Sequence, residues 1–232
     1  GTSEKNLNRR LDNYGTVTWS GYRITSDGAP VFNNFAGALF DIQAEETLFA
    51  SYSNTYGTLN NAGTLRKSAG AHASTIYGTL NQTGVIELRT GIVSLINDFS
   101  PGATSTLRVY LGGVAASTGY GQLQVGGAIT INGTLDVVTN GYVPVNNDAF
   151  TIIAGNATAT GAFTTTTGTD LGGNLVLVVS TPLSGGVLLT ATQQTPGGVR
   201  PQLRPTVIDG QLTLSWPVGS AVGWQLQVSP SL

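Results

Sequence analysis

Short runs of alternating apolar and polar residues fill most of the chain, and many of them end at Gly or Asn. Residues 106–111 read Thr-Leu-Arg-Val-Tyr-Leu, and residues 134–138 read Thr-Leu-Asp-Val-Val. Such alternation is typical of a strand with one face in the core. Charged residues make up 9% of the chain, against about 25% in an average globular protein. Low charge and many β-branched residues favour strands over helices and predict an all-β chain.

A polar phrase recurs along the first part of the chain. Its asparagines are Asn13, Asn34 and Asn61, with Gln82 in the equivalent place, and its glycines are Gly15, Gly37, Gly63 and Gly84. The glycines are separated by steps of 22, 26 and 21 residues. Periods of this size mark a solenoid, in which each coil stacks on the next. The repeat therefore predicts a parallel β-solenoid.

Alignment of the coils on this phrase predicts which residues are neighbours. It places Val17, Leu39, Leu65 and Ile86 in one inward column, and Thr18, Phe40, Arg66 and Glu87 on the opposite face. Residues on adjacent parallel strands lie about 4.8 Å apart. We therefore expect the pairs Arg66–Glu87 and Asp41–Lys67 across adjacent coils, each worth roughly 0–1 kcal/mol if exposed.

The repeated asparagines and glycines are predicted to mark coil corners. Asn tolerates the left-handed conformation, and the glycines meet the same backbone demand. The amide of each Asn can bond to the matching amide in the coils above and below, which would form a ladder. The motif is therefore interpreted as structural and not as a catalytic loop.

The second half of the chain contains a series of short phrases in a distinctive order. They are Gln122–Gly126, Ile131–Leu135, Gly141–Pro144, Phe150–Ile153, Gly161–Phe163 and Val187–Thr190. This order resembles the C-terminal part of autotransporter-type passenger β-helices. The phrase at residues 60–70 resembles coils of large, repeat-rich secreted surface proteins of bacteria. The resemblance implies a right-handed parallel β-helix in a secreted, extracellular or cell-surface protein that acts as an adhesin or scaffold.

Composition changes near residue 193 and predicts three parts. Residues 1–192 are expected to form the β-helix, with a polar N-terminal cap and C-terminal capping strands. Residues 193–205 contain three prolines and read as a linker. Residues 206–232 are expected to form strands at 210–217 and 223–228 and resemble the start of a fibronectin-III-like sandwich.

Composition also limits the chemistry that the chain offers. The formal net charge is −2 and the basic residues are scattered, so no nucleic acid partner is expected. There is no cysteine, and His72 is the only histidine, so a zinc site has too few ligands. A serine triad could use only His72, and no Gly-x-Ser-x-Gly elbow occurs. No run of about 18 apolar residues predicts membrane insertion. We expect no cofactor, no metal and no catalytic residue.

Two features of the sequence are compatible with a site that cleaves or binds carbohydrate. Asp41 and Glu45 could lie on one face of a strand, and polysaccharide-degrading enzymes use paired carboxylates. Phe49, Tyr52 and Tyr56 fall in an insertion of the longest coil. Their rings could contact a ligand by stacking on sugars, or they could plug the side of the solenoid.

The sequence therefore predicts a non-enzymatic structural or adhesive module of a bacterial surface protein. Self-assembly into a filament or sheath through strand edges would make a second copy its partner. Cell-surface glycans are the other candidate partner. A carbohydrate-binding receptor module is the main alternative, and a polysaccharide-degrading β-helix enzyme is a further one.

Overall fold

The fold is that of a computed structural model, which describes residues 3–182, 185–194, 204–208 and 211–215. The chain divides into two compact units, Gly1–Thr192 and Gln193–Leu232. The described residues form strands, turns and loops, with no helix among them. Each unit is considered by itself.

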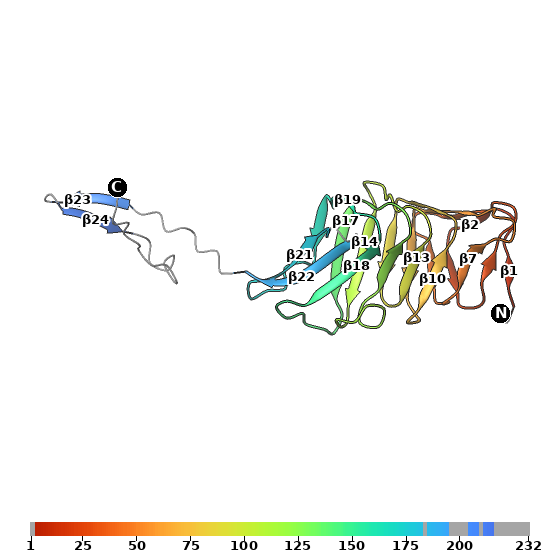
Figure 1. The fold of residues 1–232 in the computed structure, drawn as a ribbon, viewed down its shortest axis with the longest axis horizontal. Helices are drawn as coiled ribbons and strands as arrows, with labels where there is room; N and C mark the ends of the chain where they lie inside the picture. Colours follow the sequence, from red (N-terminus) through yellow and green to blue (C-terminus); the bar gives the residue numbers. More distant parts are fainter. Residues whose placement is uncertain (1–2, 183–184, 195–203, 209–210, 216–232) are drawn as a thin grey trace. The chain divides into compact units, whose positions relative to one another are not determined.

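The strands of the first unit form three stacked sheets (Figure 1). Sheet A contains, in spatial order, β1 (Lys5–Asn6), β4 (Ile24–Thr25), β7 (Thr47–Ala50), β10 (Ala73–Ile76), β13 (Ile92–Leu95), β15 (Gln122–Val125), β18 (Ala149–Gly155), β22 (Val187–Gln193) and β21 (Leu175–Ser180). Sheet B contains β2 (Leu11–Asn13), β5 (Val31–Asn34), β8 (Thr58–Asn61) and β11 (Thr79–Gln82). Sheet C contains β3 (Thr16–Trp19), β6 (Leu39–Ile42), β9 (Thr64–Lys67), β12 (Val85–Leu88), β14 (Thr106–Leu111), β17 (Thr134–Thr139) and β20 (Thr165–Thr167), and a separate short pair joins β16 (Thr130–Ile131) to β19 (Thr160–Gly161).

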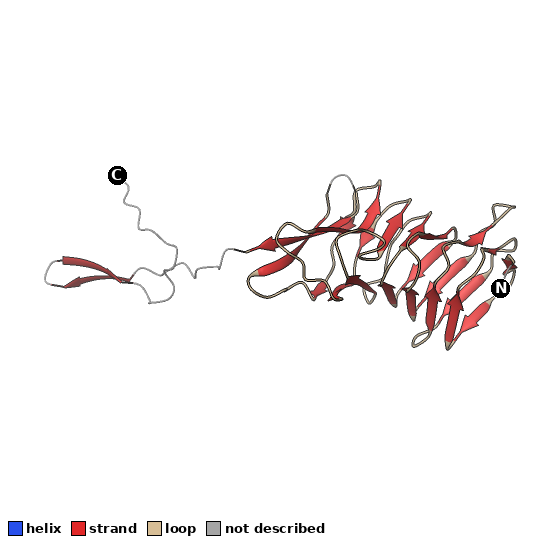
Figure 2. Ribbon diagram, turned by 90° about the horizontal axis from the view of Figure 1, so that it is seen from below, coloured by secondary structure: helices blue, strands red, loops and turns tan. Residues whose placement is uncertain are grey.

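From β1 to β12 the chain visits sheets A, B and C in turn, so that β4, β5 and β6 make one coil and β7, β8 and β9 make the next. Each strand pairs in parallel with its counterpart one coil away, as β5 does with β2 and β8. Figure 2 shows the successive strands lying side by side in this stack. The first unit is therefore all-β, with mostly parallel strands in a solenoid-like arrangement, as the repeat predicts.

The inward column of sheet C differs from the predicted one at a single coil. Val17 lies opposite Phe40, and Phe40 lies opposite Leu65. The predicted member Leu39 instead lies opposite Thr16 and is half-buried. The second coil has one extra residue at its corner, and a slip of one residue moves a side chain to the other face of a strand. Phe40, predicted to face outward, is therefore fully buried in the core.

Two of the four corner glycines, Gly63 and Gly84, are needed for space, and only Gly37 has a left-handed backbone. Of the four, only Gly37 has a positive φ, at 84°. A Cβ atom on Gly63 would lie 2.4 Å from the carbonyl oxygen of Ala38, and one on Gly84 would lie 2.2 Å from that of Gly63. The prediction that these residues adopt the left-handed conformation was therefore wrong for Gly15, Gly63 and Gly84. It was also wrong for the asparagines, which end strands with negative φ.

Parallel stacking in sheet A ends at β18. The next strand in the sheet, β22, runs antiparallel to β18 and brings Leu189 opposite Phe150. Both side chains are fully buried. The reversal of direction lets the last strands cover the apolar interior of the final coils.

The second unit contains an antiparallel pair, β23 (Arg204–Ile208) and β24 (Gln211–Ser215). Arg204 and Pro205, predicted as the end of the linker, belong to β23. Ile208 pairs with Gln211. The strand predicted at 223–228 lies outside the described residues.

Candidate functional site

The amides that recur at the ends of the sheet B strands form a ladder of hydrogen bonds inside the stack. Asn13 Nδ2 donates to Asn34 Oδ1 at 2.8 Å, and Asn34 Nδ2 donates to Asn61 Oδ1 at 2.7 Å. Asn61 Nδ2 then donates to Gln82 Oε1 at 2.8 Å. All four side chains are buried. The four amides therefore act as one continuous internal support for sheet B.

A second ladder, which the sequence analysis missed, runs along the outer face of the same strands. Asn33 Nδ2 donates to Asp12 Oδ1, Asn60 Nδ2 to Asn33 Oδ1 and Asn81 Nδ2 to Asn60 Oδ1, each at 2.7 Å. The doubled Asn-Asn at positions 33–34 and 60–61 was the signal, because adjacent residues of a strand face opposite sides.

The two ladders point in opposite directions along the stack. Donation in the inner ladder runs from the first coil to the fourth, whereas donation in the outer ladder runs from the fourth to the first. Asp12 has only acceptors when ionised, so it suits the last position of the outer ladder. Hydrogen bonds from Arg10 and Asn33 lower the pKa of Asp12 and keep it ionised. At the end of the inner ladder, Gln82 Nε2 donates to the carbonyl oxygen of Gly84 at 2.8 Å.

The predicted aromatic loop is divided between the core and the surface. Tyr52 is 73% exposed, and its hydroxyl accepts a hydrogen bond from Arg23 Nη2 at 2.7 Å. Tyr56 is partly exposed, and its ring lies 5.8 Å from that of Tyr77. Both tyrosines are therefore accessible to a ligand.

Phe49 does not belong to this exposed group. It is the third residue of β7, is fully buried and has a φ of 62°. Its ring occupies the space above Gly57 and Gly78, where an added Cβ would lie 2.8 Å from ring atoms. The interpretation as a ligand-contact residue was wrong for Phe49, which plugs the side of the solenoid.

The two carboxylates considered for catalysis, Asp41 and Glu45, lie in different environments. Asp41 is buried on the outer face of sheet C, where its Oδ2 accepts a hydrogen bond from Gln43 Nε2 at 2.8 Å. Glu45 lies at an exposed corner, where backbone N–H groups of His72 and Ala71 bind its carboxylate and lower its pKa. A carboxylate already held by two donors is a poor general base. This arrangement does not form the open acid pair that a glycosidase needs.

The predicted Asp41–Lys67 pair is absent, because Lys67 faces the core. Lys67 lies in register with Ile42 and is fully buried. Its ammonium group donates to the carbonyl oxygen of Ala44 at 3.2 Å and to that of Ala69. Burial lowers the pKa of Lys67, while the charges of Glu45 and Asp41 oppose this shift. The ammonium thus ties two successive coil corners together.

Charged side chains alternate along the outer face of sheet C. The aligned column consists of Thr18, Asp41, Arg66, Glu87, Arg108, Asp136 and Thr167. Arg66 and Glu87 are neighbours, as the alignment predicts, with Nε and Oε1 3.2 Å apart. Arg108 Nε lies 2.6 Å from Asp136 Oδ2. Arg89, two residues after Glu87 on the same face, places its Nε 2.5 Å from Glu87 Oε1.

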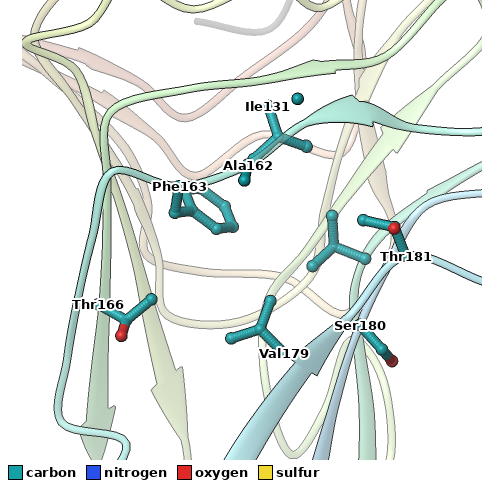
Figure 3. A pocket seen from close by; sticks show the side chains of 9 residues that line it. Ile131, Ala162, Phe163, Thr166, Val179, Ser180 and Thr181 are labelled. Carbon is teal, nitrogen blue, oxygen red and sulfur yellow. The ribbon is translucent and has the colours of Figure 1, made fainter.

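A cavity of about 240 Å³ lies near the last coils of the first unit (Figure 3). It is lined by Ile131, Gly161, Ala162, Phe163, Thr166, Val179, Ser180, Thr181 and Val187. None of these residues is charged or titrates near neutral pH. The cavity therefore offers an apolar surface with a few hydroxyl groups and no acid or base.

In the part of the chain that the structure describes, no three His, Cys, Asp or Glu side chains gather closely enough to hold a metal ion. None of the described residues lies in a helix long and apolar enough to cross a membrane. No protein-family description, curated protein or solved structure matches this chain.

Proposed function

We propose that this chain is a non-enzymatic structural or adhesive module of an extracellular bacterial surface protein, built as a right-handed parallel β-helix. The observation that carries this proposal is the pair of amide ladders. They join four successive coils through six side-chain hydrogen bonds of 2.7–2.8 Å. Because these amides stack regularly from coil to coil, they support a role in maintaining the shape of the protein.

The proposed mechanism is that of a stiff spacer. Each coil adds one rung of about 4.8 Å to the stack, so the number of coils sets the length. Buried amides, the tethered Lys67 and the ion pairs Arg66–Glu87 and Arg108–Asp136 all connect one coil to the next. Bending or sliding of coils would break several of these bonds together.

Self-assembly would use the edges of the stack. Among the described strands of sheet C, β3 and β20 each pair with one neighbour, and these two strands bound the sheet. Strand edges have backbone groups that can pair with another chain. A second copy is therefore the proposed partner at these edges.

Negative-stain electron microscopy, together with light scattering over a concentration series, tests the proposal. We expect elongated particles that lengthen into filaments as concentration rises. A Thr167→Lys substitution should shorten the filaments, because a charge on β20 disfavours edge pairing. Thr75→Lys, on the interior strand β10, is the control. Round particles at every concentration would contradict the rod, and elongated particles that never lengthen would contradict self-assembly alone.

A further inference from the structure

Three arginines from consecutive coils cover one area of sheet C. Arg66 lies on β9, Arg89 directly follows β12 and Arg108 lies on β14. Their side chains are 27%, 45% and 37% exposed. The carboxylate between them, Glu87, is only 4% exposed. The surface of this arginine cluster is therefore formed mainly by guanidinium groups, with Glu87 beneath them and Asp136, at 23% exposed, beside Arg108.

The carboxylates below hold the arginines by one edge. Arg66 and Arg89 both donate from Nε to Glu87 Oε1, and Arg108 donates from Nε to Asp136. A guanidinium has five N–H donors in a planar fork, so an Nε bond leaves the donors of the Nη groups. Arg66 uses one of these as well, at 3.5 Å from Glu87 Oε2.

Aromatic contact further restrains the central arginine. The guanidinium carbon of Arg89 lies 4.8 Å from the centroid of the Tyr110 ring. A cation over an aromatic face is attracted to it. The cluster is therefore fixed in place before any ligand arrives, which lowers the entropy cost of binding.

We propose that the arginine cluster binds a linear anionic polysaccharide through its carboxylate or sulfate groups. Arg66 and Arg108 lie on either side of Glu87 in register, so they are two rungs, or about 10 Å, apart. A polymer lying along the stack can place successive acidic groups against them. Asp41 lies in register with Arg66 on its other side, so three carboxylates match the three arginines. The guanidinium groups are more exposed than these acids, and this exposure favours an anion.

The neighbouring column favours a sugar polymer over other polyanions. Thr64, Thr106 and Thr134 lie on the same outer face, two residues before Arg66, Arg108 and Asp136, and Val85 lies between Thr64 and Thr106 in this column. The threonine hydroxyl groups can both donate and accept, as sugar hydroxyls do. This inference does not depend on the scaffold role or on self-assembly.

The test measures binding of the full chain to polygalacturonate, dextran sulfate and neutral dextran by isothermal titration calorimetry at low ionic strength. We expect binding to one or both anionic polymers and none to dextran. The carboxylate and sulfate polymers identify which anion is preferred. Arg89→Gln should weaken binding about tenfold, the loss of roughly one charge-assisted hydrogen bond. Glu87 keeps Arg66 as a partner in this variant, so the fold should persist.

Arg10→Gln is the matched control, because Arg10 also donates from Nε to a carboxylate, that of Asp12 at 2.8 Å. It removes the same charge from sheet B and should leave the affinity unchanged. The proposal is overturned if neither anionic polymer binds, or if Arg10→Gln weakens binding as much as Arg89→Gln. It is also overturned if Tyr52→Ala abolishes binding and Arg89→Gln does not.

Discussion

Burial of the inner amide ladder predicts different losses of unfolding free energy when two adjacent asparagines, Asn34 and Asn33, are replaced by Ala. Asn34 is 1% exposed and takes part in three hydrogen bonds, with Asn13, Asn61 and the carbonyl oxygen of Thr64, at 2.7–3.0 Å. Asn34→Ala removes all three bonds. It leaves the oxygens of Asn61 and Thr64 buried without this donor, whereas Asn13 keeps its bond to Leu39. At about 1 kcal/mol per bond, plus the cost of unsatisfied acceptors, the loss should be roughly 3–5 kcal/mol.

Asn33→Ala is the matched control, since Asn33 has the same side chain in the same strand but faces outward. Asn33 also bonds to two ladder partners, Asp12 and Asn60, at 2.7 Å. Water can replace these bonds, so the loss should be less than about 1 kcal/mol. Urea unfolding followed by circular dichroism gives the two midpoints, and the slopes show whether the transitions are comparable. Equal losses for the two variants would refute the reasoning that burial gives the inner ladder its strength.

Two further predictions concern the corners and the buried lysine. Gly84→Ala should lower the melting temperature strongly, because its Cβ would lie 2.2 Å from the carbonyl oxygen of Gly63. Gly15→Ala is the control, because its Cβ would meet nothing within 4 Å. Equal melting temperatures for the two variants would contradict the steric argument. For Lys67, a folded-state pKa below its ordinary value means that the unfolded chain binds more protons between the two values. Stability should therefore rise with pH across that interval, and a comparison of wild type with Lys67→Met, melted from pH 7 to pH 10, should show this rise only in the wild type.

The repeat in the sequence predicts the stacking well because it depends on a regular feature. Every coil of the first part has an amide at the end of its sheet B strand, and these amides meet when like residues stack. The neighbours Arg66 and Glu87 follow from the same alignment. The alternating pattern also identifies strands such as β14 and β17, whose inward residues are buried.

The errors come from local geometry that the pattern does not contain. The sequence shows an extra residue in the second coil, but not whether that residue belongs to the corner or to the strand. Its position determines whether Leu39 or Phe40 faces the core. Lys67 lies at an inward position because backbone oxygens from two corners surround its ammonium group. Phe49 faces inward through an unusual backbone conformation. Each of these depends on contacts between coils whose corners differ in length.

Each amide ladder runs in a single direction, and this order determines how the stack can change its length. Every interior Asn receives a hydrogen bond from one neighbouring coil and gives one to the other, while Asp12 and Gln82 close the series at its two ends. A duplicated interior coil with the same Asn-Asn pair can enter the series with every amide matched. Genetic duplication or deletion of such a coil would therefore lengthen or shorten the stack by one rung without creating an unpaired buried amide.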